Sequence, residues 1–373
     1  MSENGSRRLL FHAALPHHFV FFQPVYERLA ADPRLDWFWS ANFFGWRMKT
    51  HLFDLFPVKG KKVNSLLSTA RAYDLLLAPV YLKFDVAPRA RLRVQIFHGV
   101  AITNCFLKTA ILDYHRFFMI GEYMVRRFAQ KGILRQDDPR IDRIGMPKLD
   151  RLVNGEIDTA ALRRELELDP ALPVVLYAPS GTHSSITTNG LELIGRLQQM
   201  PINLLIKLHD KSLDFRRNVS DWLSEVKKRA TGGLPAAAGR VRVLEGFDIV
   251  PYLALADLLI SDFSSAANEF LLRDRPVIFL PTPEKVEINK ERWDTEVWGH
   301  KVGVVANSLD ELVAAVEDGL AHPEKMSDIR RAAAADMFYQ PGTATGRAVN
   351  RIYELLEMAP PDSRQPAAAA VGA

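Results

Sequence analysis

The sequence predicts an α/β protein built from two doubly wound domains, each a parallel sheet with helices packed against it. Short runs rich in leucine and β-branched residues alternate with longer helical patterns along most of the chain, which is typical of βαβ units. A length of 373 residues suits two domains of roughly 150 residues each. Turn signals such as Asn154-Gly155 gather in residues 145–169, so we place the seam between the domains there.

In the first half, strands are expected where short apolar runs stand between turn signals. They are Arg8–Ala13, Leu35–Ser40, Tyr73–Ala78, Arg93–Phe97 and Arg116–Ile120. Helical patterns follow at Pro24–Ala31 and Glu122–Gln130. We assign residues 1–155 to the N-terminal domain.

The second half repeats this alternation. The predicted strands are Val174–Ala178, Asn203–Leu208, Val241–Leu244, Leu258–Ser261, Val277–Leu280 and Val302–Val305. The predicted helices are Thr159–Glu167, Leu191–Gln199, Ser220–Arg229, Ser265–Leu272, Leu309–Leu320 and Glu324–Asp336. We assign residues 156–342 to this domain, 343–358 to a C-terminal helix, and the proline- and alanine-rich residues 359–373 to a disordered tail.

Composition excludes several classes of protein. With 48% hydrophobic and 25% charged residues, the chain is neither disordered nor fibrous. Cys105 is the only cysteine, so no intrachain disulfide forms and a reducing, cytoplasmic setting is expected. A net charge of +4 is too small to indicate nucleic acid as a partner. No run reaches the roughly 20 apolar residues that span a bilayer.

The strongest candidate site follows the strand that ends at Ser261-Asp262. Ligands of open α/β sheets bind beyond the carboxyl ends of strands. Ser264 or Ser265 stands at a helix N-cap position there, so backbone N–H groups and hydroxyls suit a diphosphate. Glu269, one turn further, can accept ribose hydroxyls. An alternative stays open, in which the serines only cap the helix and Glu269 is a solvated acid.

Two more strand ends in the second half carry candidate donor-binding residues. Lys207 and His209 follow one strand, where an ammonium and an imidazole can pair with phosphate oxygens. Ser180, Gly181 and Thr182 form a small-residue loop after another strand, through which the backbone can approach a ligand. Either segment is also compatible with an ordinary surface loop.

In the first domain, His98 stands at a strand end and is followed by Gly99. A histidine there can act as a general base toward a hydroxyl, or it can simply be bonded to neighbouring backbone. His12, His17 and His18 follow or end the first strand and can line the same edge. Neither HExxH nor a Cys/His ligand spacing occurs, so we expect no metal.

Six segments, taken together and in this order, resemble the CDP-glycerol glycerophosphotransferase family of teichoic-acid and capsule enzymes. The resemblance covers about residues 93–358 and is most specific between Asp257 and Phe279. The segments are Phe97-His98-Gly99, Gly145-Met146-Pro147-Lys148-Leu149-Asp150, Leu176-Tyr177-Ala178-Pro179-Ser180, Ile206-Lys207-Leu208-His209, Ala256 to Ser265, and Asp274-Arg275-Pro276-Val277-Ile278-Phe279.

The resemblance implies a GT-B fold, in which two Rossmann-like domains face each other across a cleft and the C-terminal one holds the nucleotide. It also implies attack of an acceptor hydroxyl on the β-phosphorus of a CDP-polyol, with CMP leaving. By the same resemblance His98 accepts the hydroxyl proton, and His209 and Lys207 stabilise charge on the diphosphate. The expected partners are a nucleotide-activated donor and a glycan or lipid-linked acceptor, and no cofactor is expected.

The chain departs from the family pattern at several positions. Val100-Ala101 stand where the family usually has Thr-Pro, Asp210 replaces the proline after the second histidine, and Phe263 replaces a tyrosine. Two other functions therefore stay open: a GT-B glycosyltransferase with a nucleotide-sugar donor, and a catalytically silent nucleotide-binding scaffold.

A lipid-linked acceptor would place the enzyme on the inner face of the cell membrane. Residues 42–62 interleave aromatic with basic side chains, a composition that suits an interfacial segment. An aromatic core segment with a basic solvated flank fits equally well. The residues concerned are Phe43, Phe44, Trp46, Phe53 and Phe56 with Arg47, Lys49, Lys59, Lys61 and Lys62.

Overall fold

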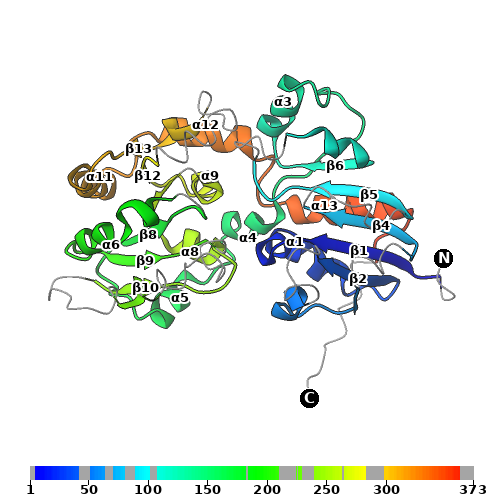
Figure 1. Cartoon of the computed structure of the whole chain (residues 1–373), viewed down its shortest axis with the longest axis horizontal. Coiled ribbons are helices and arrows are strands. Elements are labelled where there is room, and N and C mark those ends of the chain that lie inside the picture. Colours follow the sequence, from blue (N-terminus) through cyan, green and yellow to red (C-terminus); the bar gives the residue numbers. More distant parts are fainter. Residues whose placement is uncertain are drawn as a thin grey trace, which may run out of the picture. The chain divides into compact units, whose positions relative to one another are not determined.

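The chain forms two compact units in a computed structural model (Figure 1). The structure describes residues 5–41, 51–63, 70–79, 89–100, 107–181, 184–209, 224, 226–228, 239–262, 264–282 and 298–361. The first unit contains the described residues up to Gly99, then Leu107–Asp150, and the C-terminal stretch from Phe338 onward. The second unit contains Val100 and Arg151–Met337 among the described residues. The C-terminal helix, which the sequence left as a separate segment, is thus part of the first unit.

The first unit is built on a parallel sheet of seven strands in the order β3-β2-β1-β4-β5-β6-β7. Five of these strands confirm the sequence prediction, while β3 and β7 were missed. Both missed strands are short, polar and at a sheet edge, so no apolar run marks them. The strands are β1 (Arg7–Ala13), β2 (Leu35–Ala41), β3 (Lys61–Lys62), β4 (Tyr73–Ala78), β5 (Ala90–Ile96), β6 (Arg116–Met119) and β7 (Ile141–Arg143).

Helix α1 (Pro16–Leu29) begins eight residues earlier than the helix predicted from Pro24. Its N-cap residue is extended and Pro16 supplies a fixed φ at the first helical position. The helix then continues through Pro24, because a buried stripe that includes Phe19, Phe22 and Leu29 holds both halves against the sheet. The earlier start places His17 and His18 in the first turn of the helix.

The other helices of the first unit are α3 (Glu122–Gln130) and α13 (Ala344–Leu356), with short 3₁₀ turns between strands. Helix α3 has the predicted bounds, and α13 nearly so. The 3₁₀ turns are η1 (His51–Leu55), η3 (Thr109–Asp113) and η4 (Pro147–Leu149).

The second unit has a parallel sheet of six strands in the order β10-β9-β8-β11-β12-β13. All six were predicted, although β13 starts two residues late because Gly299–Val302 forms a 3₁₀ turn, η8. In both sheets the first and fourth strands are neighbours and the chain winds outward from them, which confirms two doubly wound sheets. The strands are β8 (Val174–Ala178), β9 (Asn203–Ile206), β10 (Val241–Val243), β11 (Leu258–Ser261), β12 (Val277–Phe279) and β13 (Val304–Val305).

The helices of the second unit largely follow the predicted pattern. Helix α8 was not predicted, and α6 begins six residues before the predicted Leu191. The predicted helix 220–229 lies mostly outside the described residues, as do residues 362–373 of the predicted tail. The helices are α4 (Asp150–Val153), α5 (Thr159–Glu165), α6 (Ser185–Leu197), α8 (Val250–Leu255), α9 (Ser265–Phe270), α11 (Leu309–Ala321) and α12 (Ser327–Met337), with η7 (Leu271–Arg273) directly after α9.

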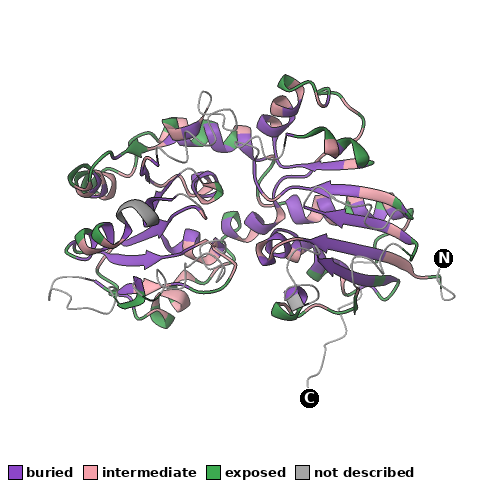
Figure 2. Cartoon of the chain, viewed as in Figure 1, coloured by how far each residue is buried: buried purple, intermediate pink, exposed green. Residues whose placement is uncertain are grey.

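Aromatic side chains dominate the core of the first unit, and the central strands of both sheets are buried (Figure 2). Phe53 is 1% exposed, and its ring centroid lies 5.0 Å from that of Trp39. Phe56 packs on Phe19 at 4.7 Å. In the described part of segment 42–62, Phe53 and Phe56 pack in the core while the lysines are exposed, as the second interpretation of its composition holds. Residues 42–50 lie outside the described residues.

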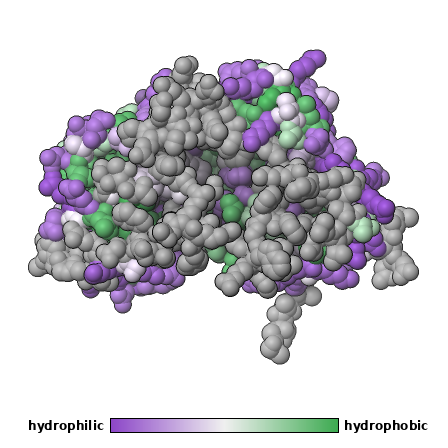
Figure 3. Space-filling model, in the orientation of Figure 1, coloured by the Kyte–Doolittle hydropathy of each residue, from purple (hydrophilic) through white to green (hydrophobic). Residues whose placement is uncertain are grey.

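On the face shown in Figure 3, hydrophilic residues and scattered apolar ones share the described surface. The exposed large apolar side chains come from separate elements, for example Leu55, Leu112 and Val304. Within the described residues, no helix combines the length and apolar character needed to cross a bilayer.

The segment Gly145 to Asp150 attaches the C-terminal helix to the first unit. Asp150 is 9% exposed, and its carboxylate accepts the backbone N–H groups of Ala344 (3.0 Å) and Thr345 (2.6 Å), which open α13. Gly145 has φ +90°, and a Cβ there would lie 2.6 Å from the carbonyl oxygen of Tyr339. This family segment therefore has a structural role in the protein. Asp150 caps α13, and Gly145 lets the backbone pass close to the carbonyl group of Tyr339.

Substitution of Asp150 by alanine should destabilise the first unit by about 1–2 kcal/mol, because two N–H groups of α13 lose their acceptor. Urea unfolding monitored by circular dichroism would measure this loss. Asp150→Asn keeps an acceptor oxygen and should lose less. Equal stability of wild type and Asp150→Ala would contradict the capping role.

A buried arginine organises a second family segment, Asp274-Arg275-Pro276. Arg330 is 1% exposed and donates to the carboxylate of Asp274 at 3.0 Å and to the carbonyl of Pro323 at 2.7 Å. Asp274 adopts φ +49°, in the left-handed region, where η7 ends. The segment thus fixes α12 beside the turn that leads into β12.

Candidate active site

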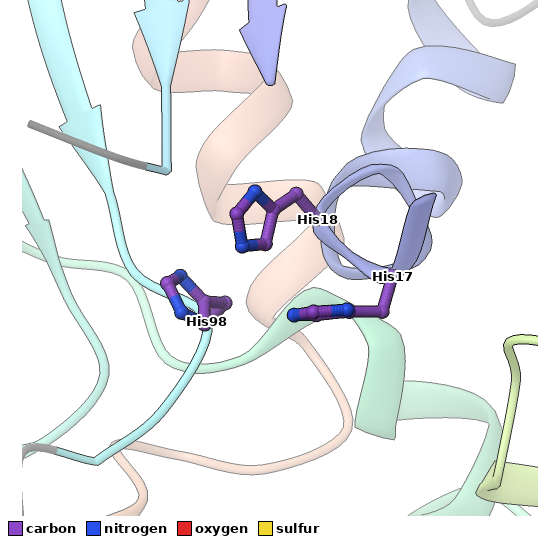
Figure 4. A group of neighbouring side chains, drawn as sticks. All are labelled: His17, His18 and His98. Atoms are coloured by element: carbon purple, nitrogen blue, oxygen red, sulfur yellow. The ribbon is translucent and has the colours of Figure 1, made fainter. Parts of the chain in front are cut away.

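Three histidines converge at the carboxyl ends of the strands of the first unit (Figure 4). His17 and His18 lie in the first turn of α1, after β1, and His98 follows β5. The ring centroids of His18 and His98 are 4.4 Å apart, those of His17 and His18 are 4.5 Å apart, and those of His17 and His98 are 5.9 Å apart. One nitrogen from each ring lies within 4.8 Å of the other two. We call these three residues the histidine cluster.

A backbone contact fixes the tautomer of His98. Its Nδ1 lies 3.0 Å from the carbonyl oxygen of Pro79, which follows β4. Because a carbonyl oxygen can only accept, Nδ1 must carry the proton, and in the neutral ring Nε2 then carries the lone pair. The two interpretations offered by the sequence are thus compatible, since a bond to neighbouring backbone orients the ring for use as a base.

His18 has the opposite tautomer. The backbone N–H of Ala14 donates to its Nδ1 at 3.2 Å, so Nδ1 carries the lone pair and the neutral ring bears its proton on Nε2. His18 is 3% exposed. His12 does not join the cluster, because it is fully buried in β1 and its Nδ1 bonds to the hydroxyl of Ser40 at 2.7 Å.

The spacing of the histidine cluster raises the question of a metal ion, which the sequence did not predict. A neutral imidazole has one lone pair, and that of His18 is engaged by Ala14. His18 would have to give up this hydrogen bond to coordinate a metal. The arrangement therefore suits proton chemistry better, and the absence of a metal stays a prediction.

A buried lysine adds positive charge near the cluster. Lys148 is 5% exposed, and its ammonium lies 3.9 Å from the ring centroid of Phe21. That ring is in turn 6.0 Å from the ring of His98. Together with the N-terminus of α1, this cation favours an anionic ligand. Lys148 was expected only as part of a family segment, and its sequence neighbours give no sign that it is buried.

In the second unit, Ser180 and Asp262 meet where the winding of the sheet reverses, after β8 and β11. The carboxylate of Asp262, fully buried, accepts the backbone N–H of Ser180 at 2.9 Å and its hydroxyl at 2.8 Å. It also accepts the N–H of Ser185, which opens α6, at 3.2 Å. Asp262 therefore joins two loops and the start of a helix.

The serines near α9 bond to one another. The hydroxyl of Ser261 contacts the carbonyl of Ala178 at 2.6 Å and the hydroxyl of Ser264 at 2.7 Å. Ser264 occupies the predicted N-cap position, but its side chain makes no capping hydrogen bond, and Ser265 is exposed. Glu269 is 1% exposed, so its interpretation as a solvated acid is wrong.

The remaining predicted donor residues lie after β8 and β9. Lys207 is 5% exposed and donates to the carbonyl of Leu208 at 3.1 Å, while His209 is half-buried. Gly181 is half-exposed, and Thr182 lies outside the described residues. The binding and catalytic roles assigned to all these residues stay predictions.

His300, which was not predicted as a site residue, lies on η8. Its ring packs against Phe279 at 4.7 Å. Burial lowers the pKa of His300, and the negative charge of Asp262 opposes that shift. This histidine lacks a recognisable motif, and only the fold brings it near Asp262.

Two doubly wound α/β units of this kind define the GT-B class of fold. A family model described as CDP-Glycerol:Poly(glycerophosphate) glycerophosphotransferase matches residues 121–357, well over half of the chain. The chain belongs to this family and is a CDP-glycerol glycerophosphotransferase-like enzyme.

Solved structures agree on the fold. The wall teichoic acid polymerase TagF superposes with a TM-score of 0.70 at 14% identity, covering 95% of this chain and 91% of that one. A TagF variant soaked with CDPG gives 0.66 at 14% identity, covering 95% and 90%. MnaA of S. aureus, solved with UDP, gives 0.62 at 11% identity, covering 96% and 99%. No curated protein matches the sequence significantly.

Proposed function

We propose that this enzyme transfers glycerol phosphate from CDP-glycerol to a hydroxyl of a cell-envelope glycan or lipid-linked acceptor and releases CMP. The observation that carries the proposal is the hydrogen bond from His98 Nδ1 to the carbonyl of Pro79, since it leaves Nε2 as the basic atom. Family membership supplies the donor, and the soaked TagF structure supports the same choice.

The reaction follows from this tautomer. The acceptor hydroxyl donates to His98 Nε2, and its oxygen attacks the β-phosphorus of the donor. A new phosphorus–oxygen bond forms, the bond between the β-phosphorus and the bridging oxygen breaks, and CMP leaves with that oxygen. The proton of the hydroxyl passes to His98, which later releases it to solvent.

The second unit holds the donor in this proposal. The ammonium of Lys207 and the imidazole of His209 offset charge on the diphosphate. The loops after β8 and β11 approach the nucleotide, and Glu269 accepts the ribose hydroxyls. The proposed donor-binding residues are Ser180, Gly181, Thr182, Lys207, Ser261, Asp262, Ser264, Ser265 and Glu269.

Nucleotide selectivity tests the proposal. In a thermal-shift panel of CDP, UDP, GDP and ADP, we expect CDP alone to raise the melting temperature. A ligand at 100 times its dissociation constant adds about 2.7 kcal/mol, which corresponds to several degrees for a protein of this size. CDP-glycerol with a glycan acceptor should then release CMP.

The alternatives give different results in the same assays. A selective UDP or GDP response with release of a nucleoside diphosphate would identify a nucleotide-sugar glycosyltransferase. Nucleotide binding without any turnover would indicate a scaffold. Either result would overturn the proposed transfer.

A further inference from the structure

We infer that His18 is a further catalytic residue, a neutral hydrogen-bond donor that works beside the base His98. This inference rests on the proposed function for its chemistry and on the histidine cluster for its geometry. The two neighbouring rings have opposite tautomers: Nε2 carries the lone pair in His98 and the proton in His18.

The positions of the rings allow one reacting group to contact both. One nitrogen of each ring of the cluster lies within 4.8 Å of the other two, and the rings of His18 and His98 lie beside each other (Figure 4). Hydrogen bonds to oxygen span about 3 Å. An acceptor hydroxyl on His98 therefore places the attacked phosphoryl group, whose oxygens lie next to the attacking atom, within reach of His18.

The hydrogen bond from the backbone N–H of Ala14 to Nδ1 favours the neutral form of His18. In a charged imidazolium, Nδ1 would carry a proton that points at the N–H of Ala14. The N–H of Ala14 would then lose its acceptor, and because His18 is only 3% exposed, water could not easily replace it.

A neutral donor at this position stabilises the transition state. As the acceptor oxygen attacks, negative charge grows on the non-bridging oxygens of the transferred phosphoryl group. The Nε2–H of His18 donates to one of these oxygens and transfers no proton, while the hydroxyl proton passes to His98. His18 is fixed in this orientation by backbone, so it does not need to reorganise during the step.

Two substitutions of His18 separate this catalytic role from a structural one. In His18→Asn the amide oxygen can take the place of Nδ1 and accept the N–H of Ala14, but no donor reaches the position of Nε2. In His18→Gln the amide nitrogen reaches that position instead. We expect His18→Asn to lower kcat about 10²-fold with little change in KM, and His18→Gln to recover much of the loss.

Other outcomes would overturn the inference. A purely structural histidine would make His18→Asn the active variant and His18→Gln the impaired one. His322→Gln, at an exposed residue of the second unit, is the control for the change of side chain and should retain full activity.

A second measurement does not depend on turnover. Long-range ¹H–¹⁵N spectra of the full chain, with peaks assigned by the same variants, report which ring nitrogen carries the proton. We expect His18 to be neutral with its proton on Nε2, and His98 to carry its proton on Nδ1. A charged His18, or the other tautomer, would refute the inference even in an active enzyme. If both tautomers are as predicted but the protein does not turn over CDP-glycerol, the proposed function is wrong and the assigned tautomers are correct.

Discussion

His98→Ala should reduce kcat by about 10²- to 10⁴-fold while CDP still binds, because the acceptor hydroxyl loses its base and the donor residues are untouched. CMP release at saturating CDP-glycerol would measure the rate, and a CDP thermal shift would measure donor binding. The bond of Nδ1 to Pro79 makes this prediction specific, since it leaves Nε2 alone to accept the proton.

His98→Gln and His98→Asn sharpen the test. Neither amide is basic, so both variants should be as slow as His98→Ala even where the side chain keeps its place. His115→Ala, which alters an exposed histidine whose Nδ1 accepts the N–H of Arg93, is the matched control. A His98→Ala enzyme with the rate of wild type would eliminate His98 as the base.

Asp262→Ala should destabilise the second unit by about 3 kcal/mol and abolish the response to CDP. Two backbone N–H groups and one hydroxyl lose a buried acceptor, and each such loss costs about 1–3 kcal/mol. The loop at Ser180 and the start of α6 then separate from β11. Denaturant unfolding followed by tryptophan fluorescence would measure the stability.

Ser180→Ala provides the graded control for this change. It removes one hydroxyl donor and leaves the carboxylate and both N–H groups in place, so a loss of only about 1 kcal/mol is expected. If Asp262→Ala and Ser180→Ala were equally stable, the loops would not depend on the buried carboxylate.

The sequence was sufficient to predict most of the fold because the central strands are uninterrupted apolar runs. Val174–Ala178 and Leu258–Ser261 match the observed strands at both ends. The start of α1 was missed because Pro24 resembles a helix boundary, whereas the decisive factor is the buried face that continues on both sides of it. Edge strands such as Lys61–Lys62 exist only through pairing with a neighbour.

The candidate site was predictable in its residues but not in its contacts. Strand ends pointed to His98, Ser180 and Asp262 without showing that Asp262 bonds to Ser180. The tautomers of His18 and His98 depend on Ala14 and Pro79, whose backbone groups carry no signal in a sequence. Such contacts arise only when distant strands are brought together.

The division of the chain also has a consequence for its synthesis. Nearly all of the second unit is one stretch, Arg151–Met337, which stands between parts of the first unit in the sequence, and only Val100–Phe106 comes earlier. The core of the first unit includes Ile352 and Leu356 of α13, so it cannot close until α13 has left the ribosome. The second unit can complete its fold earlier, and the half of the protein that is translated first is the half that finishes folding last.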